Sequence, residues 1–239
     1  MSRHGPRRGR PRRVGPYGGQ LAPEGLGING LPGHPRPHSP SEPAFVPRPP
    51  GHTSARKGER RCPVSGIGGS DRRLIVIVRH GKAVPKHTAA DPDRDLTARG
   101  RRDAGAAGRW LEQSGHRVDL AVSSTSLRTR RTWQMMLPHL SAPPPAYYTE
   151  ELYHADAGGL LAVLRRQAPE LSGILLVGHN PAVHELAAAL AGSGTKNLRN
   201  HLDQAFPTSS IAVLTVSRPW DGIGPGTARL ADLWTPQGG

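Results

Sequence analysis

The sequence has few of the residues that would cross-link the chain or anchor it in a membrane. It contains one cysteine in 239 residues, which excludes a disulfide scaffold and a zinc module built on several thiolates. No apolar run approaches the ~20 residues that span a bilayer, and the longest runs resemble residues 74–78 in length. Neither a P-loop for nucleotide phosphates nor an HExxH zinc motif is present. The sequence therefore predicts a soluble protein that disulfides do not hold together.

Residues 1–70 lack any apolar pattern that could build a core. They hold 13 of the 25 prolines, 14 of the 30 glycines, and 12 lysines and arginines against three acids. Such a segment cannot bury enough apolar surface to offset the entropy of ordering it. We predict a disordered basic extension over residues 1–70 and one compact domain over residues 71–239. No apolar h-region follows the arginine-rich start, so the sequence predicts a cytoplasmic protein.

Three interpretations of the basic extension are open. It could be a solvated tail without a partner, the product of a gene start placed too far upstream, or an arm that binds nucleic acid by neutralising phosphates. Its only aromatic residues are Tyr17 and Phe45, which disfavours binding of single strands by base stacking. We favour the first two interpretations over a nucleic-acid partner.

From Arg73 onward, apolar runs rich in β-branched residues alternate with segments of helical character. The predicted strands are 74–78, 119–122, 147–148, 174–177, 211–216 and 229–234, and the predicted helices are 97–114, 127–137, 158–166 and 181–190. Thr97 is expected to cap the first helix, and Asn180 the last, with Pro181 at its first position. This alternation predicts an α/β fold with a mostly parallel sheet. In such sheets, ligands bind outside the carboxyl ends of the strands.

Polar clusters follow three of the predicted strands. They are Arg79-His80-Gly81, the turn over residues 123–126 with Arg128 just beyond it, and Gly178-His179-Asn180. Two histidines and two arginines at one sheet edge point to a phosphate site, because guanidinium groups match phosphate oxygens. A single histidine or arginine here would more often be structural, so the prediction depends on their combination. A second RHG tripeptide, Arg3-His4-Gly5, follows no strand and is set aside.

These segments resemble the histidine phosphatase superfamily, and its SixA branch of phosphohistidine phosphatases in particular. The resemblance rests on LIVIVRHG (74–81), DLT (95–97), STSLRTRRT (124–132), VGHNP (177–181) and FPTSSIAV (206–213). It implies a three-layer α/β/α sandwich in which Arg79, His80, Arg128 and His179 form the phosphate pocket. It also implies that His80 is the nucleophile and that no metal or cofactor takes part.

The mechanism implied by the resemblance is covalent phosphoryl transfer. Neutral His80 attacks phosphorus, while Arg79, Arg128 and a protonated His179 hold the phosphate oxygens, and water then hydrolyses the phosphohistidine. Lys82 and Arg131 depart from residues common in the family, which bears on substrate preference.

A proton donor for the leaving group is not evident in the sequence. Glu151 is either that acid or a surface charge, and Arg94 is either an extra phosphate contact or a surface residue. The leading interpretation is a metal-independent phosphohydrolase that removes phosphate from phosphohistidine in proteins. The alternatives are a phosphatase of small phosphate esters or anhydrides, such as nucleotide or sugar phosphates, and a nucleic-acid-binding protein with a vestigial phosphatase domain.

Overall fold

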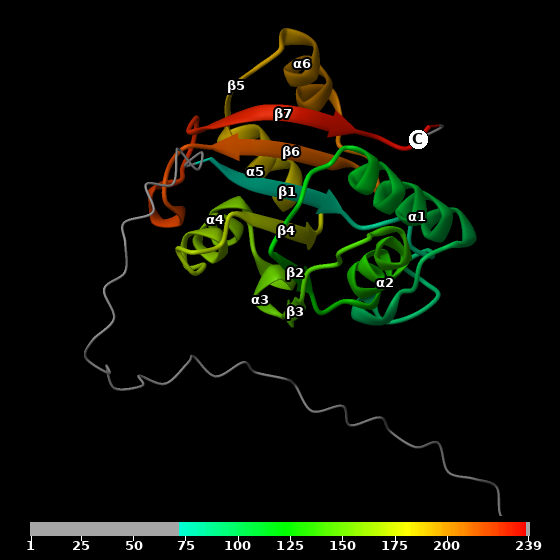
Figure 1. Cartoon of the computed structure of the whole chain (residues 1–239). Helices are drawn as coiled ribbons and strands as arrows, with labels where there is room; N and C mark the ends of the chain where they lie inside the picture. Colours follow the sequence, from blue (N-terminus) through cyan, green and yellow to red (C-terminus); the bar gives the residue numbers. More distant parts are fainter. Residues whose placement is uncertain (1–71, 238–239) are drawn as a thin grey trace, which may run out of the picture. The chain divides into compact units, whose positions relative to one another are not determined.

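The structure, a computed structural model, describes residues 72–237 (Figure 1). The predicted extension over residues 1–70, including the Arg3-His4-Gly5 tripeptide, lies outside the described residues.

A seven-stranded sheet forms the centre of the fold, in the order β3-β2-β4-β1-β6-β7-β5. Its strands are β1 (Arg73–Arg79), β2 (Leu120–Ser124), β3 (Ala146–Thr149), β4 (Gly173–Gly178), β5 (Ala191–Gly194), β6 (Ile211–Val216) and β7 (Ala228–Trp234). β6 runs antiparallel to β1 and β7, whereas the other four pairings are parallel. The prediction of a mostly parallel sheet is confirmed.

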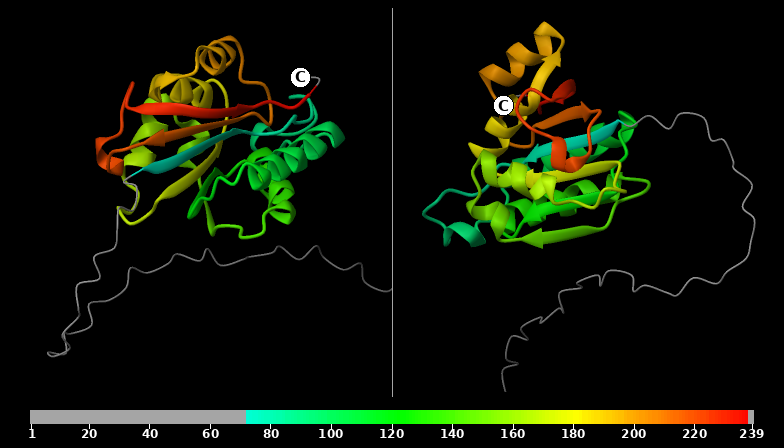
Figure 2. Two further views of the ribbon diagram at one scale, coloured as in Figure 1. Left: turned by 45° about the horizontal axis from the view of Figure 1, so that its top comes forward. Right: turned by 90° about the vertical axis from the view of Figure 1, so that its left-hand side faces the viewer.

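Helices cover both faces of this sheet (Figures 1 and 2). They are α1 (Ala98–Gln113), α2 (Leu127–Met136), α3 (Glu151–His154), α4 (Ala157–Arg165), α5 (Ala182–Leu190) and α6 (Lys196–Gln204). Val76 and Val78 pack in one core with α1 and α2, while Ile75 and Ile77 pack in a second core with α4 and α5. β1 is apolar at successive positions because both of its faces are buried. The fold is the expected three-layer α/β/α sandwich.

The helix ends show one confirmed cap and one wrong prediction. The Thr97 hydroxyl accepts a hydrogen bond from the Gly100 amide at 3.0 Å, so the predicted cap of α1 is confirmed. Asn180 does not cap α5, which begins two residues later. Its side-chain amide instead donates to the Phe206 carbonyl at 3.1 Å. A long-range partner therefore replaces the local helix amide as the partner of Asn180.

The structure also contains elements that the sequence pattern did not reveal. β2 continues through Ser124 instead of turning at Ser123, and β5 and α6 follow α5. α6 has only two apolar residues, Leu198 and Leu202, so this short helix offers few apolar positions from which to recognise it. Within residues 72–237, no helix is both long and apolar enough to cross a membrane.

Candidate active site

The three predicted polar clusters meet at one edge of the sheet. β1 lies parallel to β4 with Arg79 opposite Gly178, and β2 lies parallel to β4 with Ser123 opposite Val177. The His80 amide continues this pairing by donating to the Gly178 carbonyl at 3.0 Å. Parallel strands bring their carboxyl ends to the same edge, which is why segments about 100 residues apart in the sequence converge here.

His80 is held in one tautomer at the end of β1. Its Nδ1 lies 2.7 Å from the Gly81 carbonyl oxygen, which can only accept, so Nδ1 carries the proton and Nε2 carries the lone pair. The Gly81 amide donates to the Thr132 hydroxyl at 2.8 Å, which fixes this loop against α2. A Cβ atom at Gly81 would lie 2.8 Å from the Gly100 carbonyl oxygen, so the close approach of α1 requires glycine there.

His80 is neutral at physiological pH. Burial, followed by the charges of Arg128, Arg79 and Arg94, lowers its pKa to about 4 and outweighs the hydrogen bond to Gly81. An unprotonated Nε2 is therefore the stable form of this histidine in the folded protein.

Arg128 is almost completely buried, with 5% of its surface exposed. Its Nε lies 3.3 Å from Nδ1 of His179, which accepts the hydrogen bond. Its Nη1 donates to the Asp91 carbonyl oxygen at 2.6 Å, and its Nη2 donates to the Asp91 carboxylate at 2.9 Å. The guanidinium group is thus fixed in the pocket, with both Nη atoms donating to Asp91.

Arg79 is anchored by the loop that follows α6. Its Nη1 donates to the Phe206 carbonyl at 2.7 Å, whereas its Nε is buried without a hydrogen-bond partner among the described residues. Burial lowers the pKa of Arg79, but an arginine stays charged at any pH a folded protein meets. Two guanidinium groups, from Arg79 and Arg128, therefore accompany the His80 ring.

His179 faces His80 with a ring-centroid separation of 5.1 Å. Its Nδ1 accepts from Arg128, so its Nε2 carries the proton and donates to the Ser124 hydroxyl at 2.9 Å. Burial and the charges of His80 and Arg128 lower the pKa of His179 to about 3. His179 is therefore neutral in this structure at physiological pH, whereas the resemblance implied a protonated histidine. A phosphate dianion beside it would raise this pKa.

Asp91 and Tyr153 belong to the same cluster, although no sequence pattern singled them out. The Tyr153 hydroxyl donates to the Asp91 carboxylate at 2.7 Å, and its ring lies nearly perpendicular to that of His179, with the ring centroids 5.6 Å apart. The hydrogen bond from Tyr153, followed by the charge of Arg128, lowers the pKa of Asp91 to about 2. Tyr153 lies two residues after Glu151, within the segment where the sequence offered Glu151 as a candidate acid.

The sequence left the roles of Glu151 and Arg94 open, and the structure places the two residues differently. Glu151 is exposed and pairs with Arg166 at 2.7 Å. Arg94 lies closer to the site, with its Nε 3.0 Å from the Asp91 carboxylate and its Nη1 donating to the Val84 carbonyl. Glu151 is thus tied to the surface, while Arg94 contributes positive charge to the pocket.

Lys82 and Arg131, the two departures from the family pattern, are both exposed. Lys82 is exposed, and its carbonyl accepts from the amide and the hydroxyl of Thr97. The Arg131 side chain lies at the surface beside Gln134 and Asp95. These two positions belong to the surroundings of the site.

Buried polar groups without partners border the end of β1. The hydroxyls of Ser209 and Ser210 and the Asn180 Oδ1 are buried and make no hydrogen bond with the described residues. The Ser209 amide donates to the carbonyls of Arg79 and His80 at 3.1 Å each, and its φ is +67°. A serine in the left-handed region is uncommon, so the surrounding contacts hold this turn in place.

Comparison with known proteins identifies the class to which this site belongs. The family model of the histidine phosphatase superfamily (branch 1) matches residues 75–160. The uncharacterized protein Rv1276c of Mycobacterium tuberculosis is 38% identical over 162 residues, which cover 67% of this chain and 100% of that protein. The chain belongs to the histidine phosphatase superfamily.

Within the superfamily, the fold is SixA-like. A protein assigned as phosphohistidine phosphatase SixA from Nakamurella multipartitia superposes with a TM-score of 0.61 at 29% identity, covering 70% of this chain and 97% of that one. The protein histidine phosphatase SixA complexed with tungstate superposes with a TM-score of 0.56 at 26% identity, covering 68% and 96%. The predicted family is confirmed, and the comparisons support a phosphatase.

Proposed function

We propose that this protein hydrolyses phosphohistidine in proteins through a covalent intermediate on His80. The observation that carries the proposal is the hydrogen bond between His80 Nδ1 and the Gly81 carbonyl at 2.7 Å, which leaves a lone pair on Nε2 in a site where the charges of Arg79 and Arg128 act on the ring. The pKa of about 4 supports this role, because a nucleophilic imidazole must be neutral.

In the first step, Nε2 of His80 bonds to phosphorus as the bond from phosphorus to the substrate nitrogen breaks. The departing imidazole takes a proton from water. In the second step, water attacks phosphorus, releases orthophosphate and restores His80. Arg79 and Arg128 balance the charge on the phosphate oxygens in both steps. The hydroxyls of Ser209 and Ser210 make no hydrogen bond within residues 72–237 and are candidates for further donors.

The state of the nearby acids favours a phosphoramidate over an ester. Asp91 has a pKa of about 2 and is ionised, and Glu151 is paired with Arg166 at the surface. Asp91 is therefore not a proton donor at neutral pH, Glu151 is held by Arg166, and an alkoxide leaving group needs a donor. The solved protein histidine phosphatase SixA supports the same substrate class by similarity.

Tyr153 favours a second candidate function, the hydrolysis of small phosphate esters or anhydrides. Its hydroxyl lies on Asp91 within the site, and tyrosine is among the residues that act as general acids. The alternative therefore predicts an ester-hydrolysing activity that depends on Tyr153.

The test is a rapid quench of the full chain with a 32P-labelled phosphohistidine peptide. Acid-labile phosphate should appear on the protein and should be absent from His80→Ala. His87→Ala is a matched control, because His87 lies in an exposed turn between β1 and α1. Full turnover by His80→Ala would refute the proposed nucleophile.

A further inference from the structure

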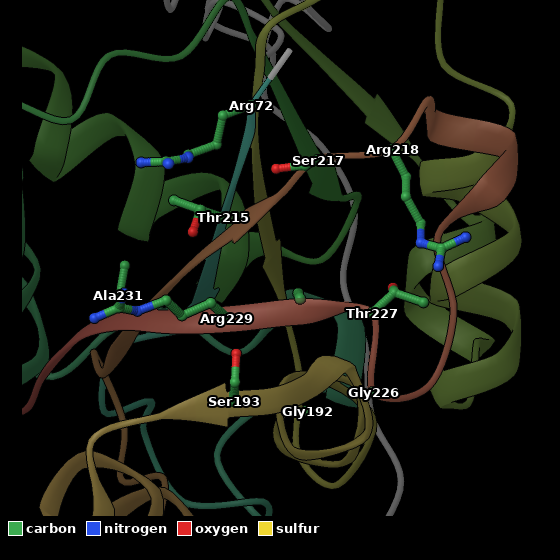
Figure 3. Close-up of a pocket in the computed structure, with 11 residues that line it drawn as sticks. Arg72, Gly192, Ser193, Thr215, Ser217, Arg218, Gly226, Thr227, Arg229 and Ala231 are labelled. Atoms are coloured by element: carbon green, nitrogen blue, oxygen red, sulfur yellow. The ribbon is translucent and has the colours of Figure 1, made fainter. Parts of the chain in front are cut away.

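A hollow of about 580 Å³ lies at the end of the sheet opposite His80 (Figure 3). Three arginines line it, from the start of β1, the loop after β6, and β7. We call this hollow the arginine pocket and define it by Arg72, Arg218 and Arg229. Hydroxyl groups and small residues complete its lining, which among residues 72–237 contains neither an acidic nor an aromatic residue. It is therefore a strongly basic and hydrophilic cavity.

Strand register places Arg229 in a row with hydroxyl groups. Arg229 lies opposite Thr215 of β6 and opposite Ser193 of β5. Cross-strand partners project from the same face of a sheet, so a hydroxyl stands on each side of the Arg229 side chain. Figure 3 shows the Ser193 hydroxyl directed toward β7, and Arg72 on the far side of Thr215. The pairing of β5, β6 and β7 thus fixes the backbone positions of these donors.

The three arginines of the pocket have no charged or hydrogen-bonding partner for their guanidinium groups among the residues that the structure describes. Within residues 72–237, the guanidinium groups of Arg72, Arg218 and Arg229 take part in neither a hydrogen bond nor an ion pair. The neighbouring Arg73, in contrast, donates to the carbonyls of Arg218 and Pro169 at 3.0 Å each. Like charges around one cavity repel each other, and a bound anion would offset that repulsion.

We propose that the arginine pocket binds a small anion that carries two or more phosphate groups, such as a short oligophosphate. Guanidinium groups bind phosphate oxygens bidentately, and serine and threonine hydroxyls supply further donors. The volume falls within the range of small-molecule sites. No aromatic side chain of the described part of the chain lines the pocket, which disfavours a ligand that must stack a base.

This site is separate from the phosphatase site. Arg72 and His80 stand at opposite ends of β1, eight residues or about 26 Å apart at the usual rise of a strand. The proposal therefore does not depend on the proposed substrate, and the two can fail independently.

Calorimetric titration of the full chain with tripolyphosphate tests the proposal. The double variant Arg72→Gln/Arg229→Gln should weaken binding by at least about 10-fold, because charge-assisted hydrogen bonds are lost. The double variant Arg102→Gln/Arg130→Gln removes the same charge from exposed helix positions and should retain the affinity. Arg218→Gln, in an exposed loop, should also weaken binding. Orthophosphate should bind less tightly than tripolyphosphate.

Three outcomes would overturn the proposal. Unchanged affinity in the pocket variants would place tripolyphosphate elsewhere on this basic chain. Loss of all binding in Arg128→Ala would place it in the active site. A single-stranded oligonucleotide that displaces tripolyphosphate and binds more tightly than it does would assign the pocket to nucleic acid. Equal melting temperatures of the variants would show that folding does not explain the differences.

Discussion

Arg128 and Asp91 are bonded twice at the centre of the site, through Nη1 to the carbonyl oxygen at 2.6 Å and through Nη2 to the carboxylate at 2.9 Å. Both donors are ones that a phosphate would use. The Asp91 carboxylate, nearly half exposed at 46%, therefore competes with phosphate for a buried arginine. Its pKa of about 2 means that this competition persists at all physiological pH values.

Removing the Asp91 charge should therefore tighten phosphate binding. Asp91→Asn keeps the shape of the side chain but weakens its hold on Arg128, so we expect the inhibition constant of orthovanadate to fall by about 10-fold, the equivalent of one charge-assisted contact. Asp93→Asn changes an exposed acid in the same turn and should leave the constant unchanged. Weaker inhibition of Asp91→Asn would show that Asp91 positions Arg128 for phosphate instead of competing with it.

Arg128→Ala should impair catalysis far more than Arg130→Ala. The first variant removes a buried donor, at a cost of roughly 2 to 4 kcal/mol of transition-state stabilisation by analogy with an oxyanion-hole donor. The second removes an exposed charge beside the Tyr148 ring, which contributes little. Steady-state kcat/KM of the two variants makes the comparison. Equal losses would mean that the wrong face of α2 has been assigned to the pocket.

The lowered pKa of His80 should appear in the pH dependence of stability. Between the pKa of about 4 in the folded protein and about 6.5 in the unfolded chain, the unfolded state binds more protons, so stability decreases as the pH falls. We expect the free energy of unfolding lost between pH 7 and pH 5 to be smaller by about 2 kcal/mol in His80→Ala. Urea titrations at both pH values measure it, with His87→Ala as the control. An identical pH dependence in all three proteins would contradict a buried, neutral His80.

The positions of the main site residues could be predicted because they follow from strand ends. The apolar run before Arg79 can only be a covered strand, and parallel pairing with the run before His179 brings the two segments together. Arg128 follows from the turn after a third strand. For these residues, the local sequence pattern and the sheet topology predict the same position at the carboxyl ends of the strands.

The remaining contacts depend on how loops fold back, which local pattern does not encode. Asp91 lies in an exposed turn and reaches Tyr153, which is 62 residues away, only because α3 follows an edge strand. Asn180 has the sequence context of a helix cap but bonds to the Phe206 carbonyl, 26 residues later. In both cases a partner distant in the sequence determines the role of the side chain, and the residues next to it in the sequence do not indicate that role.

Removal of residues 1–70 tests the proposed division of the chain. Because that segment has no apolar face to dock, kcat/KM and the melting temperature should change little. Tripolyphosphate binding should persist, since Arg72 remains, whereas any retention on nucleic acid should be lost. Differential scanning calorimetry and a salt-dependent binding assay follow these effects. A large fall in melting temperature would show that the segment stabilises the domain.

The leaving group should determine which substrate the enzyme prefers. Expulsion of the serine alkoxide requires a proton in the transition state, and a general acid supplies roughly 10²- to 10⁴-fold. An imidazole leaves more readily. Asp91, in the site, is ionised, and Glu151 pairs with Arg166 at the surface. We expect kcat/KM for a phosphohistidine peptide to exceed that for the matched phosphoserine peptide by at least about 10²-fold. Tyr153→Phe should reduce only the residual phosphoserine rate, and Glu151→Gln should leave both rates unchanged. Comparable rates on the two peptides, with the phosphoserine rate collapsing in Glu151→Gln, would instead identify Glu151 as a general acid and the protein as an ester phosphatase.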